Sequence, residues 1–192
     1  MNVFVGEKWM EKVFADVFDK MHPSFFEQEY IKNRPAEIYS DEMLLELSGY
    51  DKNKYAIDVP ENVSFGYYKG TIEMLKESVA QVEESWVQFF QENSRIYCAM
   101  AGNEIASFCL IENFGSYPYV DKILKFGGPG CVGTVPKFRR QGIGLRMVSD
   151  VTQILRDEGY DMSYIHYTGV PLWYAKLGYH TVLRWNCNGF EF

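Results

Sequence analysis

Residues 131–144 read CVGTVPKFRRQGIG, an apolar strand-like run that ends at a proline and continues into a basic loop with two spaced glycines. Pro136 cannot donate a hydrogen bond to a strand ladder, so the strand is expected to stop there. An apolar stripe at helical spacing follows the loop: Met147, Val148, Val151, Ile154 and Leu155. This spacing predicts a helix that begins near Gly142 and ends at Gly159.

The loop between this strand and helix has the chemistry of an anion site. The first turn of a helix presents free N–H groups and the positive end of the helix dipole. Gly142 and Gly144 let an anion approach the main chain, and Arg139 and Arg140 add positive charge. The order of residues fits neither a Walker A loop nor a GxGxxG dinucleotide fingerprint. A turn before a helix and a phosphate-binding loop therefore both remain open.

Length, composition and charge limit the class of protein. A chain of 192 residues with 47% hydrophobic residues is long enough for one domain, with or without an extension. The net charge of −7 argues against a nucleic-acid partner, because binding to nucleic-acid phosphates needs a basic face. The high aromatic share of 17% suggests that some rings line a pocket.

Cysteine spacing and hydropathy exclude further classes. Cys98, Cys109, Cys131 and Cys187 form no CxxC pair, so we expect reduced thiols and no metal. No apolar run approaches the roughly 18 residues of a membrane span, and the first residues are too charged for a signal peptide. The sequence therefore predicts a soluble, cytoplasmic protein.

Residues 1–60 differ in pattern from the rest and are predicted to be a helical N-terminal extension. An amphipathic stripe at spacings of three and four predicts a first helix: Trp9, Met10, Val13, Phe14, Val17, Phe18 and Met21. SDEMLLELSG, residues 40–49, predicts a short second helix with a cap at Ser40 or Asp41 and a stop at Gly49. The main domain is expected over residues 61–192.

Residues 61–192 alternate between strand and helix patterns. The predicted order is a strand at 63–70, one or two helices at 72–89, and a hairpin at 95–112 that turns at Gly102-Asn103. A loop at 113–130, the strand, loop and helix described above, a strand at 162–170, a short helix opened by Pro171 and a final strand pair follow. This order predicts a mixed α/β fold.

Two of these motifs resemble the GNAT N-acetyltransferase superfamily. RRQGIG, residues 139–144, is similar to that family's R/Q-x-x-G-x-G/A loop, and LWYAKLGY, residues 172–179, resembles its Y-x-K-L-G-F/Y ending. Residues 63–192 follow the family's order of elements. The resemblance implies an α/β (α+β) GNAT-type fold, with a mixed central sheet of about six to seven strands flanked by helices.

The resemblance also implies acetyl-CoA as co-substrate, bound between the strands at 131–135 and 162–168. Its pantetheine arm would pair with the main chain of 133–135, its pyrophosphate would rest on the N–H groups of 139–144, and an N–H near Val135 would polarise the thioester. The cofactor-binding residues implied are Gly133, Thr134, Val135, Arg139, Arg140, Gln141, Gly142, Ile143, Gly144 and Leu145.

Direct attack by an amine is the implied chemistry, with Tyr174 as the acid that protonates the departing thiolate. A ring packed under the last strands is the alternative role for Tyr174. The expected base is Glu112, or else His166; the alternatives are a solvated carboxylate at a strand end and a core histidine. Tyr167 stands where many relatives have an asparagine, which puts in doubt the contact made by that residue.

The expected activity is transfer of an acetyl group to a primary amine of a small molecule or peptide. A non-catalytic acyl-CoA-binding regulatory module is the alternative. The acidic balance hints at a cationic acceptor, and acceptor specificity is expected from residues 72–92 and 113–130. Residues 1–60 cover the acceptor site, form a homodimer contact or extend the core; the sequence does not decide among these. No nucleic-acid or membrane partner is expected.

Overall fold

The computed structural model describes the main chain of residues 8–191 and the side chains of residues 14–191. Its α-helices are α1 (Lys8–Met21), α2 (Glu29–Lys32), α3 (Ile72–Ala80), α4 (Ile143–Asp157) and α5 (Pro171–Tyr174). Its strands are β1 (Ser40–Glu46), β2 (Val63–Tyr67), β3 (Ile96–Ala101), β4 (Glu104–Tyr119), β5 (Lys122–Thr134), β6 (Met162–Thr168), β7 (His180–Asn186) and β8 (Gly189–Glu191). Short 3-10 helices occur at Phe25–Glu27, Lys52–Lys54, Glu84–Phe89, Pro136–Phe138 and Ala175–Leu177.

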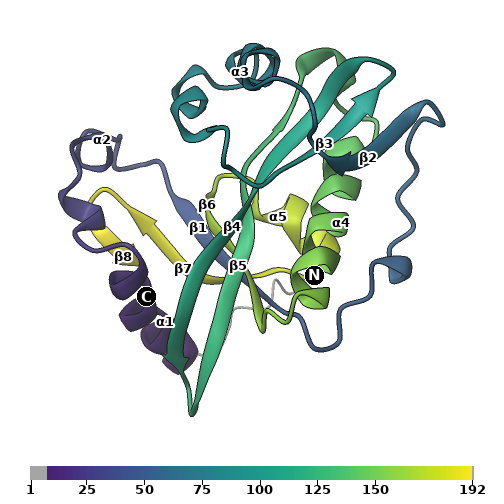
Figure 1. The fold of residues 1–192 in the computed structure, drawn as a ribbon. Coiled ribbons are helices and arrows are strands. Elements are labelled where there is room, and N and C mark those ends of the chain that lie inside the picture. The colour runs from purple at the N-terminus through teal and green to yellow at the C-terminus, as the bar shows by residue number, and fades with distance from the viewer. Residues whose placement is uncertain (1–7, 192) are drawn as a thin grey trace. The chain divides into compact units, whose positions relative to one another are not determined.

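The strands form one mixed sheet in the order β2-β3-β4-β5-β6-β1-β7-β8. β2, β3 and β4 pair antiparallel, and β1 pairs antiparallel with both β6 and β7. β5 and β6 pair in parallel at Phe126–Met162 and Gly127–Ser163. β4 and β5 are neighbours along a long hairpin (Figure 1). The predicted mixed sheet is confirmed, and it has eight strands where six to seven were expected.

Contacts within the chain divide it into two compact units. The first unit holds the described parts of Met1–Ser48, Asn113–Gly127 and Gly159–Phe192. The second unit holds Gly49–Glu112 and Gly128–Glu158. The hairpin of β4 and β5 therefore contributes one half to each unit, and the boundary expected after residue 60 stays a prediction.

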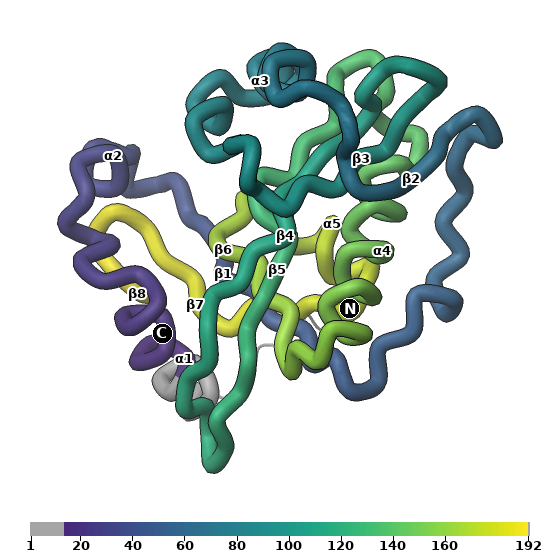
Figure 2. The backbone as a smooth tube through the Cα atoms, in the orientation of Figure 1, coloured from purple at the N-terminus to yellow at the C-terminus, as the bar shows by residue number. Residues whose placement is uncertain are grey.

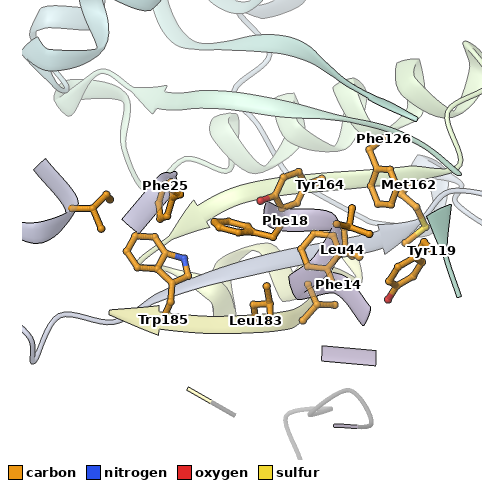
Figure 3. Packing of buried hydrophobic residues seen from close by; sticks show 13 residues of the cluster. Phe14, Phe18, Phe25, Leu44, Tyr119, Phe126, Met162, Tyr164, Leu183 and Trp185 are labelled. Carbon is orange, nitrogen blue, oxygen red and sulfur yellow. The ribbon is translucent and has the colours of Figure 1, made fainter. Parts of the chain in front are cut away.

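The first unit has an aromatic core between α1 and the strands β1, β6 and β7 (Figure 3). Phe14, Val17 and Phe18 supply the buried stripe of α1, as the helical spacing predicted. Trp9, Met10 and Val13 of that predicted stripe lie outside the described side chains. The ring of Phe14 meets Tyr164 edge-on at a centroid distance of 5.4 Å. Such edge-to-face aromatic pairs add to the stabilisation that comes from buried area.

The second unit packs α4 against β3 and against the chain that precedes β2. Met147, Val148, Val151 and Leu155 are fully buried, which confirms four of the five residues of the predicted stripe; Ile154 is only partly buried. The chain after β1 passes along α4 before it enters β2 (Figure 2). Polar contacts hold it there: the hydroxyls of Tyr50 and Ser149 lie 2.8 Å apart, and Lys52 Nζ lies 2.7 Å from Asp150 Oδ1.

The helix expected over residues 40–49 is wrong, because residues 40–46 form strand β1. β1 lies between β6 and β7, and its first five residues are buried. A strand buried on both faces shows a continuous apolar run instead of an alternation, and such a run cannot be told from a short helix by periodicity. The hydroxyl of Ser40 caps no helix and accepts a hydrogen bond from Arg34 at 2.9 Å.

The loop expected over residues 113–130 is also wrong. Most of this segment belongs to β4 and β5, which turn at Val120–Asp121 (Figure 1). Its glycines and proline indicated turns, but Phe114, Tyr117 and Tyr119 pack on the core of the first unit, and this burial favours the extended hairpin. The hairpin predicted at 95–112, the strands β2 and β6, and the helix α4 are confirmed. Among the described residues, no helix has both the length and the apolar character needed to cross a bilayer.

Candidate functional site

The loop before α4 has an unusual main-chain conformation. Arg140 and Gly142 both adopt left-handed geometry, with φ of 63° and 75°. Alternation of left-handed and other residues makes successive N–H groups converge, which favours an anion. The first hydrogen bond inside α4 runs from the Arg146 N–H to the Gly142 carbonyl at 3.0 Å, so the N–H groups of Ile143, Gly144 and Leu145 have no intrahelical acceptor.

Gly142 is required by packing as well as by its φ. A Cβ at this position would overlap the main-chain carbonyl oxygen of Asp58, and Ile57 also lies close. The sequence had attributed the missing side chain of Gly142 to close approach of a phosphate. The second unit gives another reason, since the space that a side chain would fill is taken by the segment before β2.

Side chains around this loop supply positive charge. Arg139 and Arg140 are both exposed. Arg139 donates from Nε to the Thr134 carbonyl at 3.1 Å, and Gln141 donates from Nε2 to the Lys137 carbonyl at 3.4 Å. A guanidinium carries five N–H donors, so the remaining donors of Arg139 are available to a ligand.

The end of β5 is held by the neighbouring strand β4. Ser107 donates from Oγ to the Gly133 carbonyl at 2.6 Å, and the Val135 N–H donates to the Ala106 carbonyl at 3.0 Å. The Val135 N–H is therefore engaged and cannot polarise a thioester, which corrects the expectation for that atom. Main-chain groups alternate in direction along a strand, so the N–H of Thr134 points away from β4.

Glu112 lies in the second unit, at the end of that unit's part of β4. Its carboxylate occupies the space that a Cβ on Gly130 would need. Burial, and then the charge of Glu112, raises the pKa of the neighbouring Cys131 thiol to about 12. This thiol stays protonated at neutral pH and is a poor nucleophile. The cysteines are free thiols, as expected.

Tyr174 is the last residue of α5 and is only 6% exposed. Its ring meets Trp173 edge-on at 4.8 Å and lies 6.0 Å from the ring of Tyr179. The hydroxyl of Tyr179 in turn lies 2.6 Å from Ser163 Oγ. The first unit thus holds Tyr174 in a packed aromatic environment next to β6 and β7.

His166 forms part of a buried polar cluster around Glu42, a residue that sequence analysis did not single out. The Glu42 side chain is fully buried. Its Oε1 accepts from Trp185 Nε1 at 2.7 Å. Its Oε2 lies 2.5 Å from the Tyr164 hydroxyl, 3.1 Å from the Tyr167 N–H and 3.2 Å from His166 Nδ1. We call these five residues the Glu42 cluster.

The Glu42 carboxylate is charged in spite of its burial. Burial alone would raise the pKa of Glu42, but the hydrogen bond and charge of His166, with the bonds from Tyr164 and Tyr167, outweigh it and lower the pKa. A buried carboxylate is tolerated when hydrogen bonds satisfy it. Glu42 lies inside the apolar run SDEMLLEL, which could have indicated a buried carboxylate. The run was predicted to be a helix, so Glu42 was not recognised as a partner of His166.

His22 stacks on His166 with ring centroids 3.8 Å apart and an angle of 8° between the planes. Burial, and then the charge of His166, lowers the pKa of His22 to about 4, against the opposing effect of Glu42. Two stacked imidazoles cannot both carry a proton at low energetic cost. His22 is therefore neutral at neutral pH.

His166 and Tyr174 lie on opposite faces of β6 within the first unit. Tyr164 and His166 point to the face covered by α1, where the ring of His166 lies 6.0 Å from Phe18. Ser163 points the other way, to Tyr179 and from there to Tyr174. Of the predicted site residues, the loop residues and Glu112 belong to the second unit and these two to the first.

The fold defined by this sheet and by β5, α4 and the loop between them is that of the GNAT acetyltransferases. No protein-family model and no curated protein matches the chain.

Three solved structures are similar to this chain. The first is the GCN5-related glucosamine N-acetyltransferase region of a fungal multi-domain β-N-acetylglucosaminidase, at TM-score 0.60 and 18% identity over 80% of this chain and 20% of that chain. A GCN5-related N-acetyltransferase of Sphaerobacter thermophilus gives 0.55 and 20% identity over 79% of this chain and 50% of that one. A third, of Kribbella flavida, gives 0.51 and 15% over 76% and 55%.

The chain thus spans between a fifth and about half of the length of these three structures. At identities of 15–20%, the structural likeness shows the fold alone. The activity has to be argued from the residues of this chain.

Proposed function

We propose that the protein is an acetyl-CoA-dependent N-acetyltransferase that acts on a primary amine of a small molecule or peptide. The loop before α4 carries this proposal. Arg140 and Gly142 are left-handed on a GNAT fold, and such a conformation favours convergence of neighbouring main-chain N–H groups. This arrangement suits the pyrophosphate of a CoA thioester.

The residues of the second unit fit such a ligand. The N–H groups of Ile143, Gly144 and Leu145 supply donors for the pyrophosphate, and Arg139 and Arg140 supply positive charge. Gln141 and the edge of β5 at 133–135 complete the proposed binding residues. When bound, acetyl-CoA supplies an acetyl group activated as a thioester, so no nucleophile of the protein is required.

The proton transfers are assigned to side chains of this chain. Tyr174 gives its phenolic proton to the departing thiolate. A base removes a proton from the acceptor ammonium, because an amine attacks only in its neutral form; Glu112 and His166 are the candidates. The acid and the base serve different atoms, the departing sulfur and the acceptor nitrogen.

Binding and turnover test the proposal separately. Calorimetry with acetyl-CoA tests the loop, and release of free CoA thiol in the presence of amines tests transfer. The amine panel should include glucosamine, because a solved neighbour bears that acceptor in its name, together with a polyamine, an aminoglycoside and a peptide amine. Binding of acetyl-CoA without turnover on any amine would support the regulatory-module alternative instead.

A further inference from the structure

The hydrogen bonds of the Glu42 cluster fix the tautomer of His166. The Tyr164 hydroxyl has one proton, and its 2.5 Å distance to Glu42 Oε2 identifies that oxygen as its acceptor. His166 Nδ1 lies 3.2 Å from the same carboxylate oxygen and 3.1 Å from the Tyr164 oxygen, and both are acceptors. Nδ1 must therefore carry a proton, and in the neutral ring Nε2 carries the lone pair.

The second histidine is fixed by the same hydroxyl. His22 Nε2 lies 3.3 Å from the Tyr164 oxygen, whose proton is already given to Glu42. His22 Nε2 therefore donates. Because the pKa of His22 is lowered to about 4, His22 does not compete with His166 for a proton at neutral pH.

The side chain of His166 is only partly buried. The side chain of His166 is 23% exposed, whereas that of its partner Glu42 is fully buried. Within the described residues, no hydrogen bond joins His166 Nε2 to another group of the protein. A buried carboxylate thus holds Nδ1 of a partly exposed imidazole.

The main chain next to His166 is strained where it contacts Glu42. Tyr167 has φ of 22°, in the left-handed region that residues with a Cβ rarely adopt. The pairing of β1 with β6 shifts register between Asp41 and Met43, on either side of Glu42. Both irregularities accompany the hydrogen bond from the Tyr167 N–H to Glu42. Strain of this kind tends to occur at functional sites.

We propose that His166 is the general base for the acceptor amine and that Glu42 is its positioning residue, an inference that rests on the proposed acetyl transfer. His166 Nε2 takes a proton from the acceptor ammonium, so that an N–H bond breaks and an Nε2–H bond forms. The neutral amine then forms the C–N bond while the C–S bond breaks, and the thiolate takes its proton from Tyr174. Glu42 stays ionised throughout and stabilises the imidazolium.

The tautomer can be measured on the protein without any ligand. The chain has three histidines, His22, His166 and His180, so long-range proton–nitrogen NMR of the imidazoles is simple to assign with His180→Gln as reference. We expect neutral His166 to carry its proton on Nδ1 and neutral His22 on Nε2. A neutral His166 protonated on Nε2 would overturn the proposal, because no lone pair would then face the acceptor.

Catalysis tests the role of the base through the choice of acceptor. His166→Gln should lower kcat by about 100-fold or more on an aliphatic amine that arrives protonated, the lower end of what a general base contributes. The loss should shrink to a few-fold with an acceptor of low pKa, such as a hydroxylamine or hydrazine, which arrives neutral. KM for acetyl-CoA should stay close to that of the parent. His180→Gln is the matched control and should leave both amines unaffected.

Glu42 is tested by a graded pair of variants. Glu42→Gln should show the same dependence on acceptor type as His166→Gln, and Glu42→Asp should restore part of kcat. If both histidine and glutamate variants lose the same factor on every amine, Glu42 and His166 are structural only and the proposal fails. A parent protein that binds acetyl-CoA yet acetylates no amine would refute the proposed function as well, whereas an active parent with an unimpaired His166→Gln refutes only the base.

Discussion

Replacement of Gly142 by alanine tests the geometry of the loop before α4. A residue with a Cβ in left-handed geometry costs about 1 kcal/mol. A Cβ here would also overlap the carbonyl oxygen of Asp58, a main-chain atom that cannot move without shifting the segment before β2. Strain from such overpacking typically adds about 1–3 kcal/mol. Together these effects predict that Gly142→Ala loses about 3 kcal/mol of unfolding free energy.

Gly159 provides the matched control. It follows α4, its φ of 76° is close to the 75° of Gly142, and no atom lies within 4 Å of a Cβ built on it. Gly159→Ala should therefore lose only the conformational part, about 1 kcal/mol. Urea denaturation followed by tryptophan fluorescence measures both values. Equal losses in the two variants would refute the overlap with Asp58 and with it the described path of the loop.

Three further predictions concern the proposed chemistry and the buried histidine. Tyr174→Phe should lower kcat by about 100-fold, with little change in acetyl-CoA affinity by calorimetry, because it removes only the acid; equal turnover would contradict that role. Arg139→Gln combined with Arg140→Gln should weaken acetyl-CoA binding at least about tenfold, through lost charge-assisted hydrogen bonds, and unchanged affinity would exclude both arginines from the site. The pKa of His22 is lowered to about 4 in the folded chain, so the unfolded state takes up its proton first and stability falls by up to about 3 kcal/mol between pH 6.5 and pH 4. His22→Gln should flatten that part of the urea-unfolding free energy against pH, and an unchanged slope would contradict a neutral His22 stacked on His166.

Local patterns predicted the parts of this fold whose sequence and environment agree. The helix α4 has a clear stripe with one buried side, and Gly142 and Gly159 mark its two ends, so its bounds could be predicted closely. The hairpin that turns at Gly102 could be predicted equally well, because glycine readily adopts the positive φ of 61° that this turn has. In these elements each residue's preference coincides with its place in the sheet.

Elements determined by distant partners could not be predicted in the same way. β1 is a central strand because β6 and β7, more than a hundred residues later, pair with both of its edges. The same long-range pairing brings Glu42 to His166, so the missed strand and the missed partner of His166 have one cause. Gly142 shows a related limit, because its glycine was recognised but the carbonyl of Asp58 that requires it lies far earlier in the chain.

Transfer of a labelled acetyl group tests the central claim most directly. Acetyl-CoA labelled with carbon-13 in the acetyl group is incubated with the protein and the amine panel, and mass spectrometry follows the label while a thiol reagent follows CoA. We expect a labelled N-acetyl product that appears in step with free CoA. Neither product should appear with the Arg139→Gln, Arg140→Gln protein at limiting acetyl-CoA. Acetyl-CoA bound by the protein with no labelled amide on any amine, or no binding at all, would contradict the central claim.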